Sequence, residues 1–338
     1  MTGRGRSVIV RALFGRFGRG ARARRSTLAL DLLPLLLGIA LLGIPLAAVR
    51  VAADQGQGPG QRRGQGQGKG QGQETGSGPI ASAPRQGVLP PYKPRPGRDR
   101  PVVAIVAENR FTELTDYVVP YGVLAASNAA EVHALATRPG PVQLFPALQL
   151  QPQAILEEFD ARFPDGADYV VVPAVHHIDD PTLLAWVRAQ SDKGGTVVGV
   201  CDGVWVLGKA GLLAGRQAVG HWYSVAKLGR EFPNARFQPD RRYLADGNVV
   251  TTTGVTASIP VSLALVEAIA GADRAAEVAR EMGIVRWSSE HESDAFRLRP
   301  RHVWTAARNW LSFWSREELV LPVADGVDEI ALALFADA

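Results

Sequence analysis

The chain contains a single cysteine, Cys201, and the residues around it restrict what the chain can fold into. Thr196–Val200 is a short β-branched run that predicts a buried strand, and Val204–Leu213 predicts a helix. Cys201 lies where strand gives way to helix, with Gly199 and Gly203 on either side. A sharp turn there leaves no room for side chains beside the turning residue, so we expect both glycines to be required. The spacing predicts a nucleophile elbow, the thiol counterpart of the Gly-x-Ser-x-Gly turn.

This turn predicts that the Cys201 sulfur stands uncovered above the edge of the sheet, where the N–H groups of the following helix favour thiolate. The neighbouring Asp202 works against the thiolate, because a carboxylate beside the sulfur raises the thiol pKa. A lone cysteine forms neither an intrachain disulfide nor a thiolate metal cluster, so we expect neither a metal nor a cofactor. The ordinary alternative, a small buried hydrophobic residue, stays open.

Other titratable residues are candidates to work with this thiol. Asp116, near the start of a predicted helix, can hydrogen-bond the sulfur or shuttle protons, and Glu113 competes for that role. His221 follows the cysteine in a predicted strand-end loop and can orient or deprotonate the thiol. His176 also follows a predicted strand, but it has no set of metal-ligand partners nearby in the sequence. Each of these residues also has a purely structural explanation: a histidine can be buried with its hydrogen bonds made, and an acid is favoured at the start of a helix.

Strands and helices alternate along the second part of the chain, which predicts a doubly wound α/β fold with a parallel sheet. Active sites of such sheets lie at the carboxyl ends of the strands, where Cys201 falls. The predicted strands are Val102–Ala107, Glu131–Thr137, Asp168–Pro173 and Thr196–Val200, with a hairpin of Arg241–Leu244 and Val249–Thr253. The predicted helices are Leu114–Ala130, Pro152–Phe163, Pro181–Lys193, Val204–Leu213, Trp222–Phe232 and Ala257–Ala270, the last with Thr256 as N-cap.

The charge is unevenly distributed between the two parts of the chain. Residues 1–100 carry 17 Lys and Arg against 4 Asp and Glu, whereas residues 101–338 carry 20 against 29. The basic character therefore belongs to the N-terminal third, and the predicted folded domain is acidic. An acidic domain argues against a nucleic-acid partner.

Three segments precede the predicted domain. Residues 1–27 form a basic tail predicted to be disordered, and residues 54–100 form a Gln-, Gly- and Pro-rich linker that has too few apolar residues to order. Between them, residues 28–53 contain 18 consecutive uncharged and mostly apolar residues. As a helix, that run is about 27 Å long, which is close to the thickness of a bilayer core. We therefore expect a transmembrane signal-anchor, with membrane lipid as a partner.

The arginines before this segment place the N-terminus in the cytoplasm by the positive-inside rule, and the folded domain on the outer side of the membrane. The alternative is a signal peptide cleaved before Asp54, which would leave a secreted domain.

Several motifs strongly resemble those of the ThiJ/PfpI family, also called DJ-1/PfpI. The matching stretches are Val200–Leu207, Ala210–Arg216, His221–Trp222, Asp116–Leu124 and Thr252–Ser258. The resemblance covers about residues 101–285 and is nearest to the isonitrile-hydratase branch and to the sensor half of arabinose-type regulators. It implies a flavodoxin-like fold of the class I glutamine-amidotransferase kind, with Cys201 as the elbow cysteine, Asp116 as the acid that contacts it and His221 as the family histidine.

The chain departs from the family pattern at two places beside the expected site. Pro173–His176 replaces the usual Pro-Gly-Gly, whose N–H groups can form an oxyanion hole, and Asp202 replaces the usual Thr, Ala or His. Two hypotheses therefore stand. One is a cysteine-dependent hydratase, hydrolase or glyoxalase-type enzyme acting on a small electrophilic substrate. The other is a non-catalytic sensor or redox-responsive binding module, and a homodimer is compatible with both.

The C-terminal residues form two further segments. Residues 286–318 are interpreted as an amphipathic connector, and residues 319–338 as the start of a second, partial repeat. In the second segment, Leu319–Ile330 echoes Val103–Leu114, and Leu332 stands at the position of Asp116. Chance similarity is the alternative for so short a run.

Overall fold

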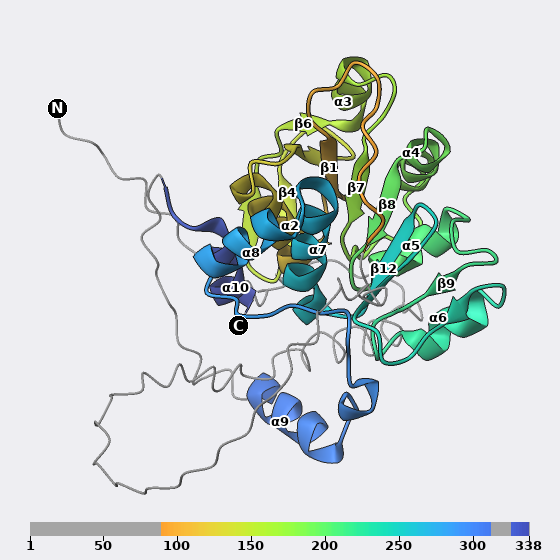
Figure 1. Cartoon of the computed structure of the whole chain (residues 1–338). Coiled ribbons are helices and arrows are strands. Elements are labelled where there is room, and N and C mark those ends of the chain that lie inside the picture. Colours follow the sequence, from red (N-terminus) through yellow and green to blue (C-terminus); the bar gives the residue numbers. More distant parts are fainter. Residues whose placement is uncertain (1–88, 312–325, 338) are drawn as a thin grey trace, which may run out of the picture.

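The computed structural model describes residues 89–311 and 326–337 (Figure 1). Its central sheet has seven strands in the order β11-β12-β8-β7-β1-β3-β6. Neighbouring strands are parallel, except that β11 and β12 form an antiparallel hairpin at one edge. The strands are β1 (Val102–Ala107), β3 (Glu131–Ala136), β6 (Ala154–Ile155), β7 (Tyr169–Val172), β8 (Thr196–Gly199), β11 (Tyr243–Asp246) and β12 (Val249–Thr252). This arrangement confirms the predicted doubly wound parallel sheet.

Helices cover both faces of the sheet (Figure 1). One face carries α2 (Leu114–Ala126), α7 (Ser258–Ala270), α8 (Ala272–Glu281) and α10 (Glu329–Asp337). The other carries α3 (Leu156–Arg162), α4 (Pro181–Asp192), α5 (Gly203–Lys209) and α6 (Val225–Glu231). The short 3₁₀ helix η2 (Val255–Ala257) precedes α7, and η3 (Ser293–Ala295) precedes α9 (Pro300–Leu311).

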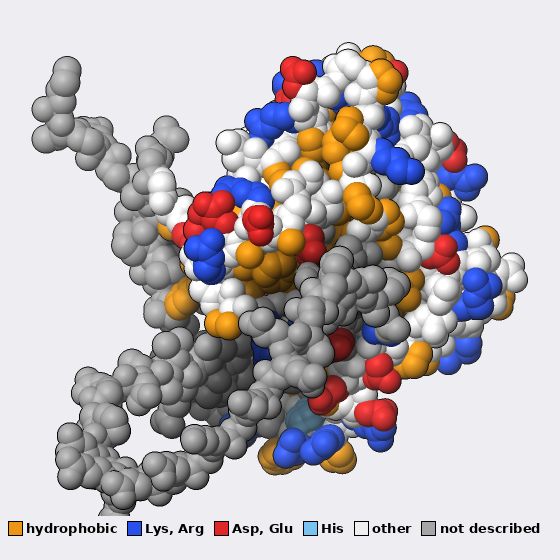
Figure 2. All heavy atoms as spheres, viewed as in Figure 1, with side chains coloured by type: hydrophobic (Ala, Val, Ile, Leu, Met, Phe, Trp, Pro, Cys, Tyr) orange, Lys and Arg blue, Asp and Glu red, His pale blue; other side chains and the backbone are white. Residues whose placement is uncertain are grey.

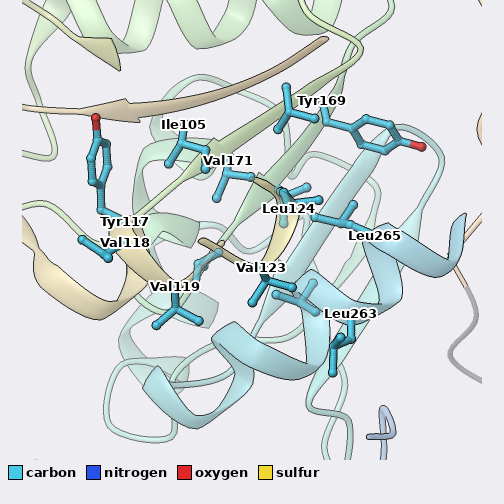
Figure 3. Packing of buried hydrophobic residues seen from close by; sticks show 14 of the residues in the cluster. Ile105, Tyr117, Val118, Val119, Val123, Leu124, Tyr169, Val171, Leu263 and Leu265 are labelled. Atoms are coloured by element: carbon cyan, nitrogen blue, oxygen red, sulfur yellow. The ribbon is translucent and has the colours of Figure 1, made fainter. Parts of the chain in front are cut away.

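Alternate residues of each central strand serve the two faces, because successive side chains of a strand point in opposite directions. In β1, Ile105 packs under α2 and α7, whereas Ala104 and Val106 pack under the helices of the opposite face. Figure 3 shows the first of these layers, in which Leu124 of α2 and Leu265 of α7 lie over the sheet. The near-continuous apolar strands of the sequence are therefore explained by burial on both sides.

Two smaller sheets within the described residues were not predicted from the sequence. β2 (Thr112–Glu113), β4 (Val142–Phe145) and β5 (Leu148–Leu150) form one, and β9 (Gln217–Ala218) pairs with β10 (Arg236–Phe237) in the other. Their strands have two to four residues each, which is too short to give a clear alternating pattern. β2 leads directly into α2 and so fixes the start of that helix.

Several predicted boundaries are wrong by a few residues. The helix predicted over Pro152–Phe163 begins only at Leu156, because Ala154–Ile155 pairs with β3 as strand β6. The helix predicted from Val204 to Leu213 ends at Lys209. Thr256 is not the N-cap of α7, since it lies within η2 and Ala257 occupies the cap position without a side-chain hydrogen bond.

Residues 89–100, expected to be linker, lie against the domain. Leu89 is buried, and the Tyr92 N–H donates to the Ala268 carbonyl at 2.8 Å. Arg95 and Arg98 form ion pairs with the buried Asp168, at 3.0 and 2.7 Å, just before β7 begins. The folded domain therefore starts earlier than residue 101, and this N-terminal strap covers the amino ends of the strands.

The segments predicted over residues 1–27 and 28–53, and most of 54–100, lie outside the described residues. Within residues 89–311 and 326–337, every helix is too short or too polar to cross a membrane. On the face seen in Figure 2, Lys and Arg side chains are interspersed with Asp and Glu side chains.

The connector and the end of the chain are described in part. The connector hydrogen-bonds to the domain, since the Arg242 N–H donates to the Ser289 carbonyl at 2.7 Å. Residues 319–325, the expected strand of a second repeat, lie outside the described residues. The following helix α10 packs against α2 of the same domain. The partial repeat itself stays a prediction.

Candidate active site

Cys201 occupies a strained turn between β8 and α5. Its φ is +55°, a conformation that residues other than glycine rarely adopt. Both flanking glycines lie in tight spaces. A Cβ on Gly203 would stand 2.1 Å from the Val172 carbonyl oxygen, and one on Gly199 would stand 2.9 Å from Leu207 Cδ2. The sequence thus folds into an elbow because only glycine fits on either side of the cysteine.

The Cys201 thiol is buried in the structure, so the expectation of an uncovered thiolate is wrong. Only 4% of the residue is exposed. Burial raises the pKa of the thiol well above its ordinary value, and the charges of Asp116, Asp202 and Glu113 raise it further. The Asp202 N–H bonds to the sulfur and lowers this pKa, but the larger effects outweigh it. The resting site therefore holds a protonated thiol.

Asp116 brings a carboxyl group to this site from the first turn of α2. Its side chain is fully buried and accepts hydrogen bonds from the Ala174 N–H at 3.3 Å and the Ser258 hydroxyl at 3.1 Å. Burial raises the pKa of Asp116 to about 7, although both hydrogen bonds act to lower it. A carboxyl group with this pKa can both accept and donate a proton near neutral pH.

Glu113 is the N-cap of α2 and lies beside Asp116. Its carboxylate accepts from the Asp116 N–H and from the Thr115 hydroxyl, so it stabilises the helix start. Burial, followed by the charge of Asp116, raises the pKa of Glu113 well above its ordinary value. Glu113 therefore holds the helix that carries Asp116 and also adds a negative charge to the site.

Asp202 and His221 form a second polar pair on the other side of the elbow. Asp202 accepts a hydrogen bond from the Ser224 hydroxyl at 2.9 Å, and burial raises its pKa while His221 lowers it. His221 is buried, which lowers the pKa of its imidazole, and the nearby Asp202 raises it. The ring lies against Gly254, where a Cβ would stand 3.2 Å from Nε2. The histidine is thus neutral and held in place at neutral pH.

The segment after β7 uses its backbone groups for structure. The Ala174 N–H donates to Asp116, and the His176 N–H donates to the Phe111 carbonyl at 3.0 Å. The His176 ring packs on Phe111, with centroids 5.5 Å apart, and burial lowers its pKa. Of the two residues that replace the glycines of Pro-Gly-Gly, Ala174 therefore has its N–H engaged by Asp116. His176 is not among the groups that perturb the thiol.

The structure therefore brings Cys201, Asp116, Glu113 and Asp202 into one electrostatically coupled cluster, to which His221 is joined through Asp202. Sequence reasoning missed Thr252, whose hydroxyl accepts from the Cys201 N–H at 3.0 Å, and Ser258, which bonds Asp116. Both lie in or after β12, the strand next to β8. Polar residues at the carboxyl end of a neighbouring strand were the available signal. Among the described residues, no three His, Cys, Asp or Glu side chains form a group that could hold a metal ion.

An α/β sheet with a cysteine elbow at the carboxyl end of a central strand defines the class I glutamine-amidotransferase-like proteins. Residues 101–268 match the DJ-1/PfpI family, and the chain belongs to that family.

The chain is similar to three known proteins. The isonitrile hydratase of Pseudomonas putida is 33% identical over 165 residues, which cover 47% of this chain and 68% of the hydratase. The HTH-type transcriptional regulator CdhR of Pseudomonas aeruginosa is 32% identical over 114 residues, 33% of this chain and 34% of the regulator. The crystal structure of Drosophila melanogaster DJ-1beta has the same fold, with a TM-score of 0.50 and 20% identity, covering 55% of this chain and 100% of that one.

Proposed function

We propose that the domain is a cysteine-dependent enzyme that adds water to a small, uncharged, electrophilic carbon compound of the nitrile-like or carbonyl class. The observation that carries this proposal is the pairing of a strained, buried Cys201 with a buried Asp116 that titrates near neutral pH. Similarity to an isonitrile hydratase, which covers 68% of that protein, supports the substrate class.

The burial and charge of the site narrow the substrate. Cys201 is almost sealed, so a small molecule fits better than a polymer or a peptide. Glu113, Asp116 and Asp202 surround the sulfur with carboxyl groups, and each one that ionises disfavours an anionic ligand. An uncharged electrophile avoids this repulsion.

For a nitrile-like substrate, the reaction begins with transfer of the thiol proton from Cys201 to the carboxylate of Asp116. The sulfur then forms a bond to the electrophilic carbon, and Asp116 returns the proton to the substrate atom that receives the displaced electron pair. Water adds to the same carbon, the carbon–sulfur bond breaks, and the departing sulfur recovers a proton through Asp116. The substrate gains the elements of one water molecule and the enzyme is unchanged. His221 assists from beside Asp202, the residue that follows the cysteine.

Turnover of a panel of isonitriles, nitriles and small aldehydes tests this proposal. Cys201→Ala removes the nucleophile and is expected to abolish turnover. Asp116→Asn keeps the shape but cannot transfer the proton, so we expect kcat to fall by about 10²- to 10⁴-fold. Turnover that survives Cys201→Ala would contradict a cysteine-dependent reaction.

The Ala174 N–H donates to Asp116 and is therefore engaged, which favours a second candidate, a redox-responsive sensor. A thiolate at Cys201 takes one oxygen atom from each of two hydrogen peroxide molecules, which leave as water, and becomes a sulfinate. A protonated Asp116 can then donate a hydrogen bond to that sulfinate. Similarity to part of the transcriptional regulator CdhR supports a sensing role.

Peroxide titration followed by mass spectrometry distinguishes this candidate. We expect a mass increase of two oxygen atoms at Cys201 before either methionine of the chain is oxidised, and a less stable product in Asp116→Asn. Equal oxidation of all three sulfur residues would rule the sensor out.

We further propose that residues 28–53 tether this domain to a membrane, with the domain on the outer side. The apolar run and the arginines before it support the tether. Protease added to intact spheroplasts is expected to digest the domain. A domain that is digested only after lysis would refute the outward orientation, and a domain released by washing would refute the tether.

A further inference from the structure

Helix α10, which comes from the far end of the chain, closes the outer face of α2. Ile330, Ala333 and Asp337 are spaced so that they share one face of α10. Ala333 is fully buried and Ile330 packs against the core cluster that includes α2. A Cβ on Gly122 would stand 2.5 Å from Ile330 Cγ1, so the glycine in α2 allows the two helices to approach closely. Figure 1 shows α10 on the same side of the sheet as α2 and α8.

The register of this pair brings Asp337 to the start of α2. Ile330 lies opposite Gly122, and Asp337 follows Ile330 by seven positions, or about 10 Å along the helix. Asp116 precedes Gly122 by six positions, or about 9 Å. In an antiparallel pair the two carboxyl groups are therefore at the same level. The charge of Asp337 raises the pKa of both Glu113 and Asp116, which agrees with this direction.

We propose that Asp337 is a positioning residue of the Cys201 site, which acts through Asp116 and shifts the balance between the ionised form of that acid, which accepts the thiol proton, and its protonated form, which donates the proton back. The groups that face Asp116 are Glu113 at the cap of α2, Asp202 at the elbow and Asp337 from α10, with the Ser258 hydroxyl from α7. All are anionic or neutral, so each ionised neighbour favours the protonated acid. This inference rests on the proposed function only in taking Asp116 as the proton-transfer partner of Cys201.

The single cysteine offers a readout that needs no substrate. In the full chain, the rate of Cys201 alkylation by uncharged iodoacetamide is measured against pH. The rate rises with pH as thiolate forms. The rise flattens at the pH where Asp116 ionises, because the new charge opposes the thiolate, and we call this change of slope the break. Asp116→Asn is expected to remove the break, which would assign it to the ionisation of Asp116.

Asp337→Asn is expected to move the break to lower pH by about half a unit or more. Asp337→Glu keeps the charge and is expected to restore the break toward its original position. Glu329→Gln makes the same charge change at the other end of α10 and is expected to leave the break in place.

Two outcomes would overturn the proposal: a break that does not move in Asp337→Asn, or one that moves equally in Glu329→Gln. If Asp337→Asn does not fold, Ile330→Ala weakens the packing of α10 without changing any charge, and the break is then expected to move the same way. An unmoved break in that variant also contradicts the proposal. Since alkylation is measured without turnover, a failed hydration assay leaves this test unaffected.

Discussion

Asp168 and Asp116 are both buried carboxyl groups of the same sheet, and they lie at opposite ends of its strands. Asp168, at the amino end of β7, is paired with Arg95 and Arg98 and accepts the Val102 N–H at 2.7 Å. Asp116, at the carboxyl end, lies near other acids, and burial, with a smaller contribution from the charges of those acids, raises its pKa to about 7. An aspartate therefore anchors the chain at one end of the sheet, and another aspartate holds an exchangeable proton at the other end. Both side chains are buried, and the two arginines paired with Asp168 make the difference.

The largest expected effect concerns the turn at the Asp116 end. Gly203→Ala places a Cβ against two backbone oxygens, those of Val172 and Pro173. Because backbone yields less readily than a flexible side chain, we expect a loss of about 3 kcal/mol or more in the free energy of unfolding. Urea denaturation measures it.

Gly229→Ala provides the matched control, since this exposed helical glycine has no atom near its Cβ position. It should raise stability by about 0.5–1 kcal/mol. Similar losses in both variants would show that the elbow is not the constrained position.

The second prediction tests the paired end. Asp168→Asn leaves Arg95 and Arg98 without their counter-ion, so we expect a loss of about 3 kcal/mol at pH 7. Thermal unfolding and urea unfolding, each at low and at high salt, measure this loss of stability. If Asp168→Asn left the free energy of unfolding unchanged, the two ends of the sheet would not differ as described.

The third prediction tests the acidic end through pH. Folding raises the pKa of Asp116 from 3.8 to about 7, so the folded protein keeps a proton that the unfolded chain has lost. This contribution to stability is present below pH 3.8 and is lost as pH rises to about 7. Asp116→Asn has no such loss and is expected to be more stable than the parent at pH 8, by roughly 2 kcal/mol.

Urea unfolding of both proteins between pH 4 and pH 8 checks this expectation. Burial lowers the pKa of four histidines and gives a slope of the opposite sign, but these residues are common to both proteins: His133, His176, His221 and His291. A constant difference between the two stability curves would count against a titrating Asp116.

The smallest expected effect lies beside His221. Gly254→Ala brings a Cβ to 2.8 Å from the imidazole Cδ2, but a side chain can move aside more easily than backbone. We expect a loss of about 1 kcal/mol together with a changed His221 environment. The imidazole proton NMR signals follow both the position and the titration of this ring, and unchanged signals would contradict the close contact.

The sequence was sufficient to predict the central fold, because apolar strands and helix periodicity are local signals. It also placed Cys201 in an elbow, since two glycines at that spacing between a strand and a helix are typical of this turn. The sequence left both an uncovered and a buried thiol open, and it could not decide between them, because burial depends on packing between segments as far apart as Asp116 and Cys201, which are 85 positions apart. The roles of Thr252, Ser258 and Asp337 likewise depend on packing between distant segments.

The N-terminal strap has a consequence for how the domain is oriented. Leu89, Arg95 and Arg98 hold the incoming chain at the pole where the strands begin, and the cysteine lies at the opposite pole. Residue 89 therefore enters the domain at the end opposite the thiol, so the contacts that fasten the chain to the sheet and the contacts that make the candidate site share no side chain.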